Sequence, residues 1–152
     1  MKAALMRHLL NLWPPFFAAG IHVTALAPDF RHARVELRQR PWNRNYVGTH
    51  FGGSLFAMTD PFWMFLVLRG LGKDYIVWDK AAEIEFVKRG RGTVHAEFHV
   101  DDALLDAIRT ETADGDKHLR WLPADVRDAH GELVARVRKQ IYVRRKPAKP
   151  GT

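Results

Sequence analysis

The chain has 152 residues, of which 47% are hydrophobic and none is cysteine. This length and composition fit one globular domain that buries a core without disulfides, and they exclude a cysteine nucleophile and a thiolate metal site. The formal net charge of +7 favours an anionic partner such as nucleic acid, an acidic carrier protein or a phosphorylated cofactor.

Residues 1–19 predict an N-terminal helical segment. Leucines at 5, 9 and 12 and a tryptophan at 13 have the spacing of one apolar helix stripe, and Pro14 ends it. The early Lys2 and Arg7 resemble the start of a secretion signal, but Asn11 and the prolines interrupt the apolar run that follows. No stretch reaches the roughly 20 apolar residues that span a bilayer. We therefore expect a cytoplasmic protein with no membrane partner.

Two strands and a buried helix are predicted next. Apolar and polar residues alternate around Ile21 and Val23 and again from residue 33 to 37, which is typical of strands joined by a turn. Residues 43–53 are rich in Asn and Gly and indicate a loop. From residue 54 to 71 the pattern is helical and apolar nearly all round, which indicates a helix buried on most sides.

The rest of the chain predicts four more strands and a short helix that begins after Asp101. The strands are expected near residues 75–88, 93–100, 118–128 and 132–144. We expect one α+β domain over residues 1–145, followed by a basic flexible tail over 146–152. Its sheet of about six antiparallel strands would wrap around one long central helix, and a second copy would cover the exposed sheet edge.

The loop before the central helix carries a motif. Residues 45–53 read Asn-Tyr-Val-Gly-Thr-His-Phe-Gly-Gly, and Asp60 follows seven residues after the second glycine. This pattern resembles the signature of hotdog-fold thioesterases of the phenylacetate-pathway type. Residues 72–96 further resemble an uncharacterised bacterial branch of thioesterase-like hotdog proteins. One departure is clear, because the family motif usually has a histidine where Phe51 stands, and here the histidine is His50.

The resemblance implies a hotdog fold and hydrolysis of an acyl-CoA or acyl-carrier thioester, with coenzyme A only as part of the substrate and no other cofactor. It also implies a homodimer in which the glycines and the acid come from opposite subunits, with a dimer of dimers left open. Gly52 and Gly53 would polarise the thioester carbonyl through their N–H groups, and Asp60 would act as general base or nucleophile. Burial among aromatic residues would raise the pKa of Asp60.

Geometry adds a constraint on these roles. On one straight helix, Gly53 and Asp60 would be about 10 Å apart, too far to act on one carbonyl. Either two chains build the site or the helix bends. The alternative role for Asp60 is structural, because Pro61 follows it and an aspartate can cap a helix that restarts at a proline.

Three polar loop residues have both a structural and a functional interpretation. Asn45 either forms an Asx turn or orients a water or a thioester oxygen. Thr49 is either a loop hydroxyl or an additional hydrogen-bond donor. His50 is either structural or catalytic.

The remaining candidates would contact substrate. Phe51 and Phe56 are candidates for the acyl pocket, with core packing as the alternative. Lys88, Arg89 and Arg91 lie in one predicted hairpin turn, where they are either solvated or bind the phosphates of coenzyme A.

We therefore expect an acyl-CoA thioesterase, with a non-catalytic hotdog module that binds acyl-CoA or a lipid-like ligand as the alternative. A nucleic-acid binder rests on the charge alone, since aromatic residues are not interleaved with the basic ones. No metal site is expected, because His95 and His99 would lie about 13 Å apart on a strand. The acyl chain, and the choice between coenzyme A and a carrier protein, remain open.

Overall fold

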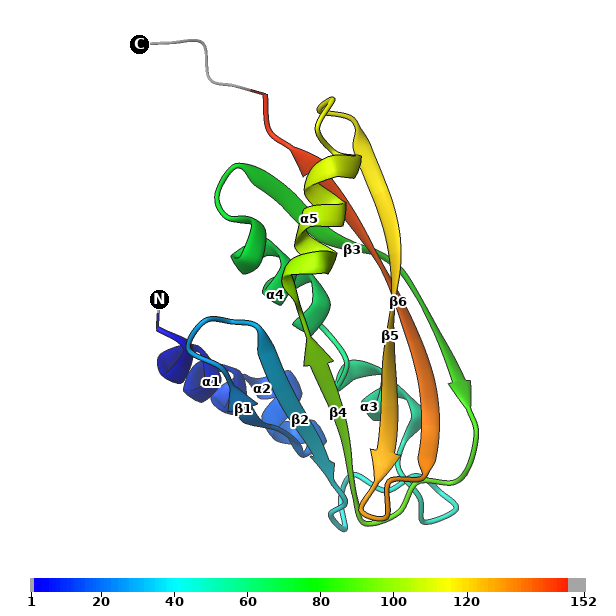
Figure 1. Cartoon of the computed structure of the whole chain (residues 1–152). Helices are drawn as coiled ribbons and strands as arrows, with labels where there is room; N and C mark the ends of the chain where they lie inside the picture. Colours follow the sequence, from blue (N-terminus) through cyan, green and yellow to red (C-terminus); the bar gives the residue numbers. More distant parts are fainter. Residues whose placement is uncertain (1, 148–152) are drawn as a thin grey trace.

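A computed structural model describes residues 2–147 (Figure 1). The chain begins with two short helices, α1 (Ala3–Leu12) and α2 (Pro14–Ala19), within the segment where helix was predicted. Pro14 is the first residue of α2, a position at which proline's missing N–H costs nothing. The proline therefore separates the two helices.

The part of the predicted C-terminal tail beyond residue 147 lies outside the described residues.

A side chain of α1 protects one edge of the sheet. Strand β1 (Ile21–Leu26) is an edge strand. The Asn11 side chain accepts a hydrogen bond from the Val23 N–H at 2.7 Å and donates one to the Val23 carbonyl at 3.1 Å. It thus pairs with the open edge in place of a neighbouring strand.

Six antiparallel strands form one sheet, as predicted. Their order is β1-β2-β4-β5-β6-β3, which leaves β3 at the second edge. Pairing is extensive between β5 and β6 and between β6 and β3, whereas β4 and β5 pair over two positions only. The strands after β1 are β2 (His32–Arg38), β3 (Tyr75–Phe86), β4 (Thr93–His99), β5 (Lys117–Asp128) and β6 (Leu133–Arg145).

The predicted central helix is present but divided. Helix α3 (Gly52–Ala57) and helix α4 (Phe62–Leu71) are separated by a turn over residues 58–61, which contains a cis Asp60-Pro61 peptide bond. Proline has no N–H to donate and its ring clashes with the preceding helical turn, which kinks or breaks a helix, and here the helix is broken before Pro61. The expectation of one long helix from residue 54 to 71 was therefore wrong at its middle.

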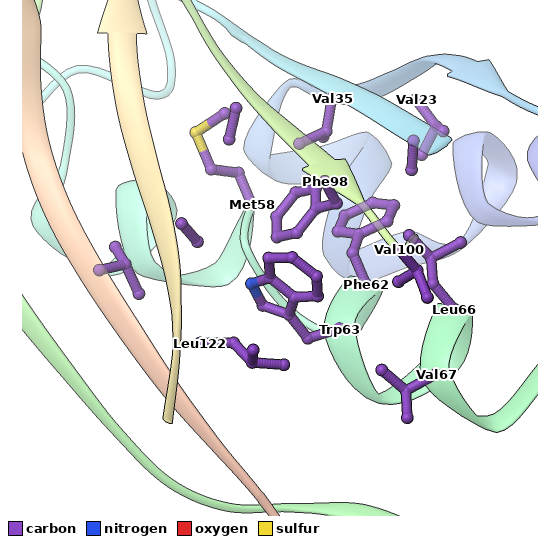
Figure 2. Packing of buried hydrophobic residues seen from close by; sticks show 14 of the residues in the cluster. Val23, Val35, Met58, Phe62, Trp63, Leu66, Val67, Phe98, Val100 and Leu122 are labelled. Carbon is purple, nitrogen blue, oxygen red and sulfur yellow. The ribbon is translucent and has the colours of Figure 1, made fainter. Parts of the chain in front are cut away.

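Aromatic rings fill the space between α4 and the sheet (Figure 2). The ring centroid of Phe98 on β4 lies 4.9 Å from that of Phe62 and 5.5 Å from that of Trp63. Trp63 also donates its indole N–H to the Pro123 carbonyl at 2.8 Å. These contacts hold α4 against the middle of the sheet and so determine where the turn before α4 lies.

Helix α5 (Asp102–Glu111) packs against α4. Its N-cap was predicted correctly: the Asp101 carboxylate accepts a hydrogen bond from the Leu104 N–H at 2.7 Å. A Cβ atom on Gly70 would lie 2.6 Å from Leu105, so glycine lets the two helices approach. Within residues 2–147, no helix has the length and apolar character needed to cross a membrane.

Candidate functional site

Asn45 organises the loop that leads into α3. Its side-chain oxygen accepts hydrogen bonds from the N–H groups of Val47 and Thr49, at 3.2 and 2.9 Å. Its amide nitrogen donates to the Thr49 hydroxyl and to the His50 carbonyl. The structure thus supports the Asx-turn interpretation, because every polar atom of this side chain is engaged within the loop.

His50 joins this loop to the turn before β4. The residue is buried, and its Nε2 lies 2.9 Å from the Gly92 carbonyl. Its backbone N–H donates to the Gly90 carbonyl at 3.0 Å. Burial lowers the pKa of His50, and the hydrogen bond to Gly92 partly opposes this change. A neutral imidazole tied to a backbone carbonyl is well suited to hold the loop in place.

The two glycines begin α3 and have a packing reason to be glycine. A Cβ atom on Gly52 would lie 2.8 Å from the Phe86 ring, and one on Gly53 would lie 2.4 Å from the Phe51 ring. Aromatic rings therefore occupy the space that we expected a ligand to use. Both rings are more than half exposed, at 56% for Phe86 and 59% for Phe51, so a ligand could displace them.

Backbone donors at this helix start are free. Helix α3 has no side-chain cap, and within residues 2–147 neither the Gly52 N–H nor the Gly53 N–H has a hydrogen-bond acceptor. Two adjacent free N–H groups can bind a carbonyl oxygen or an oxyanion.

Gly52, the first of these donors, lines a pocket of about 660 Å³. It brings together six of the residues predicted from the sequence, namely Asn45, Thr49, His50, Gly52, Lys88 and Arg89. The residues Phe51, Gly53, Phe56, Asp60 and Arg91 are not among those that line it. The apolar part of its wall comes from Val47, Leu55, Phe86 and Val87.

One basic residue at the pocket is already paired. Lys88 lies 2.6 Å from the Asp128 carboxylate and also contacts Glu132. No ion pair involves Arg89 or Arg91 within the described part of the chain. The two arginines are therefore more available to an anionic ligand than Lys88 is.

Asp60 lies on the turn between α3 and α4, outside the pocket of its own chain. Its side chain is 47% exposed, so the expected enclosure among aromatic residues is wrong. The capping interpretation is also wrong, since the N-cap of α4 is Pro61 and no side chain caps this helix. Instead the Asp60 carboxylate accepts a hydrogen bond from the Lys139 ammonium at 2.7 Å.

Lys139 and Asp79 were missed by the sequence analysis. Lys139 belongs to β6 and is buried, with its side chain 5% exposed. Its ammonium lies 3.6 Å from the carboxylate of Asp79 on β3 and 5.3 Å from the ring centre of Phe56. Burial raises the pKa of Asp79 to about 6, while Lys139 lowers it and Asp60 adds to the rise.

A signal for both residues was present in the strand patterns. On β6 the inward positions alternate through Ala135, Val137, Ile141 and Val143, and Lys139 has the same parity. Asp79 likewise continues the inward series of Tyr75 and Val77 on β3. A charged residue at an inward strand position is unusual enough to mark a candidate site.

A second and larger pocket lies elsewhere. It has a volume of about 1010 Å³ and lies where the end of β6 meets the segments before β3 and β5. Charged residues of both signs line it, including Lys73, Asp74, Asp116 and Arg144. None of the residues predicted from the sequence contributes to it. Among the described residues there is also no cluster of three His, Asp or Glu side chains that could hold a metal ion.

The sequence matches one family model. Residues 1–143 match the family described as Domain of unknown function (DUF4442). No curated protein gives a match to this chain.

Solved structures share the fold at low sequence identity. A Pseudomonas aeruginosa protein described as of unknown function and a probable thioesterase is 20% identical, with a TM-score of 0.81 and coverage of 95% of this chain and 97% of that one. A thioesterase from Haemophilus influenzae is 12% identical, with a TM-score of 0.68 and coverage of 99% and 96%. A protein of unknown function from Chlorobaculum tepidum is 14% identical, with a TM-score of 0.72 and coverage of 95% and 98%.

Proposed function

Because the chain belongs to the DUF4442 family and shares its fold with proteins described as thioesterases, we propose that it is a hotdog-fold hydrolase of acyl-CoA thioesters. One observation carries the proposal. Two free backbone N–H groups lie at the start of α3, and the first belongs to Gly52, which lines a partly apolar pocket with basic residues in its wall. Such a pocket suits an acyl chain, a thioester carbonyl and a phosphorylated carrier.

The chemistry needs an oxyanion site and a base. Water attacks the thioester carbon while the N–H groups of Gly52 and Gly53 stabilise the oxyanion that forms. Asp60 takes the proton of that water and returns it to the sulfur as the carbon–sulfur bond breaks. The products are the carboxylic acid and the free thiol of coenzyme A.

A second subunit supplies the base in this proposal. Asp60 does not line the pocket of its own chain, so the partner subunit's Asp60 would complete the site. Strand β3 offers an interface, because it is a sheet edge with exposed Ile76, Trp78 and Phe86 side chains. Pairing of two β3 edges would satisfy their backbone groups and cover these side chains. Further pairing of dimers into a tetramer is compatible with this arrangement.

Basic residues would recognise the coenzyme A part of the substrate. Arg89 lies in the pocket wall and Arg91 lies two residues away. An arginine fork can bind phosphate through two parallel hydrogen bonds. Lys88 would contribute more weakly, because it is already paired with Asp128 and Glu132.

The direct test is thiol release from a panel of short, long and aromatic acyl-CoA esters. Asp60→Asn should lower kcat by about 10²- to 10⁴-fold, the range that general base catalysis contributes. Asp106→Asn is the matched control, because Asp106 also pairs with a basic side chain, Arg109, but lies on the exposed face of α5. Full activity in the Asp60 variant would remove this residue from the mechanism.

Complementation tests the shared site. Asp60→Asn and Gly52→Val protomers should each be inactive alone. In a mixed dimer one site carries both defects and the other carries none, so about a quarter of all sites should become active after statistical mixing. No recovery would show that both groups act within one chain.

A non-catalytic acyl-CoA binding module is the second candidate. It is favoured by Phe51 at the motif's usual histidine position and by His50, which is tied to the Gly92 carbonyl. Tight binding of acyl-CoA without turnover across the panel would favour this candidate over the hydrolase.

A further inference from the structure

Three charged groups meet behind the turn that carries Asp60. Lys139 lies between two carboxylates, 2.7 Å from Asp60 and 3.6 Å from Asp79. The three residues come from the 58–61 turn, from β6 and from β3. Burial of a lysine is costly unless it is paired, and the Asp60 carboxylate at 2.7 Å is the nearer of the two partners of Lys139.

The three groups differ in their access to solvent. The Asp60 side chain is 47% exposed, whereas that of Asp79 is 21% exposed and that of Lys139 is 5% exposed. One oxygen of Asp79 is buried and has no hydrogen-bond partner among the described residues. Asp60 is therefore the most accessible of the three groups to a substrate.

We propose that Lys139 and Asp79 are positioning residues for Asp60, in which Lys139 fixes the orientation of its carboxylate and the charge of Asp79 sets its strength as a base. This inference rests on the proposed function, because it assigns a role to residues that contact Asp60 and not the substrate. Lys139 is held over the Phe56 ring as well, so its ammonium cannot easily follow Asp60 if that side chain rotates.

The net charge of the cluster formed by Asp60, Lys139 and Asp79 should change near neutral pH. Among the described residues, Lys139 from β6 and Asp60 from the turn are the charged groups that act on Asp79, and β3, α3 and α4 add no other. Burial raises the pKa of Asp79 to about 6. Above that pH two carboxylates share one ammonium, whereas below it Asp60 is the only charged partner of Lys139 in this cluster, so the charge next to Asp60 differs between the two pH ranges.

The kinetic test uses Asp79→Asn, which keeps the shape of the side chain and removes its charge. For the wild type, kcat/KM should rise about threefold or more between pH 5 and 8. The variant should show no such rise and should remain near the low-pH value of the wild type. Glu83→Gln is the control, because Glu83 pairs with Arg138 across the same two strands but is exposed. A rise in Asp79→Asn equal to that of the wild type would overturn the inference.

A test of the role of Lys139 needs a variant that still folds. Lys139→Met alone leaves two carboxylates without a cation, so the double variant Lys139→Met/Asp79→Asn is the fairer test. We expect this variant to fold and to lose at least tenfold in kcat with little change in KM, since the Asp60 carboxylate is no longer held in one orientation. Wild-type kcat in the folded double variant would contradict the positioning role.

A titration that does not depend on turnover separates this inference from the proposed function. Carboxyl ¹³C NMR of the wild type should give a midpoint near 6 for Asp79 and a shift of the Asp60 signal over the same pH range. An Asp60 signal that does not respond while Asp79 titrates would overturn the coupling. Failure to hydrolyse any acyl-CoA would instead refute the proposed function, and the NMR result would still decide the coupling.

Discussion

Asp79→Asn should stabilise the protein at neutral pH, although it removes one partner of a buried lysine. The reason is the burial of the Asp79 carboxylate, whose side chain is 21% exposed and whose inner oxygen has no hydrogen-bond partner among the described residues. Asparagine carries no charge and resembles the protonated acid in shape. The substitution therefore removes the cost of keeping a charge at this position.

The magnitude follows from the pKa of Asp79. In the folded protein burial raises it from the ordinary value of 3.8 to about 6, a difference of about two pH units or about 3 kcal/mol. Solvent screening of the exposed fifth of the side chain reduces the expected effect to about 2 kcal/mol. Between pH 3.8 and 6 the folded chain binds more protons at this residue than the unfolded chain, so stability falls as the pH rises through that window.

Urea unfolding of the wild type and of Asp79→Asn at fixed protein concentration, from pH 4 to 8, measures this effect. The difference between the two free energies of unfolding cancels the contributions of titrating groups that do not interact with Asp79. It should be near zero at pH 4 and should reach about 2 kcal/mol in favour of the variant above pH 7. A difference that stays constant over this pH range would refute the reasoning, because burial would then not raise the pKa of Asp79 in the folded protein.

Substitutions at three further residues test the fold and the loop. Phe98→Ala should lower the free energy of unfolding, measured with urea, by about 3–5 kcal/mol, because Phe98 is fully buried against Phe62. A loss below about 1 kcal/mol would contradict the packing shown in Figure 2. Asp101→Ala should cost about 1 kcal/mol in the same assay through loss of the α5 cap, whereas Asp101→Asn should cost less. Asn45→Ala should increase amide hydrogen exchange at Thr49 while leaving the sheet protected, and unchanged exchange there would show that the loop does not depend on this side chain.

Local patterns in the sequence were sufficient for most of the secondary structure. Alternation of apolar residues located the strands, since a half-buried strand must place every second side chain in the core. The N-cap at Asp101 was predictable because a cap depends on residues three positions apart. The loop and its two glycines were located from a local run of Asn and Gly residues, and the related structures share the fold of this chain.

Interpretation failed where a residue's role depends on distant parts of the chain. The contact of Gly52 with the Phe86 ring at the end of β3 could not be seen in the local sequence pattern. The break between α3 and α4 was suggested by Pro61, yet Asp60 does not cap the second helix. Its partner Lys139 lies 79 residues further along the chain, and the strand pattern that places Lys139 inward does not show that it pairs with Asp60.

The sequence by itself thus determined the elements, the loop and the acid, because these depend on periodicity and on neighbours a few residues apart. Only the tertiary structure decided which charges meet. Lys139 and Asp79 face Asp60 because β6 and β3 pair side by side and because α4 is held against the sheet by Phe62 and Trp63. The cost of burying a charge is set by what surrounds it in space, and strand order and helix packing supply those surroundings.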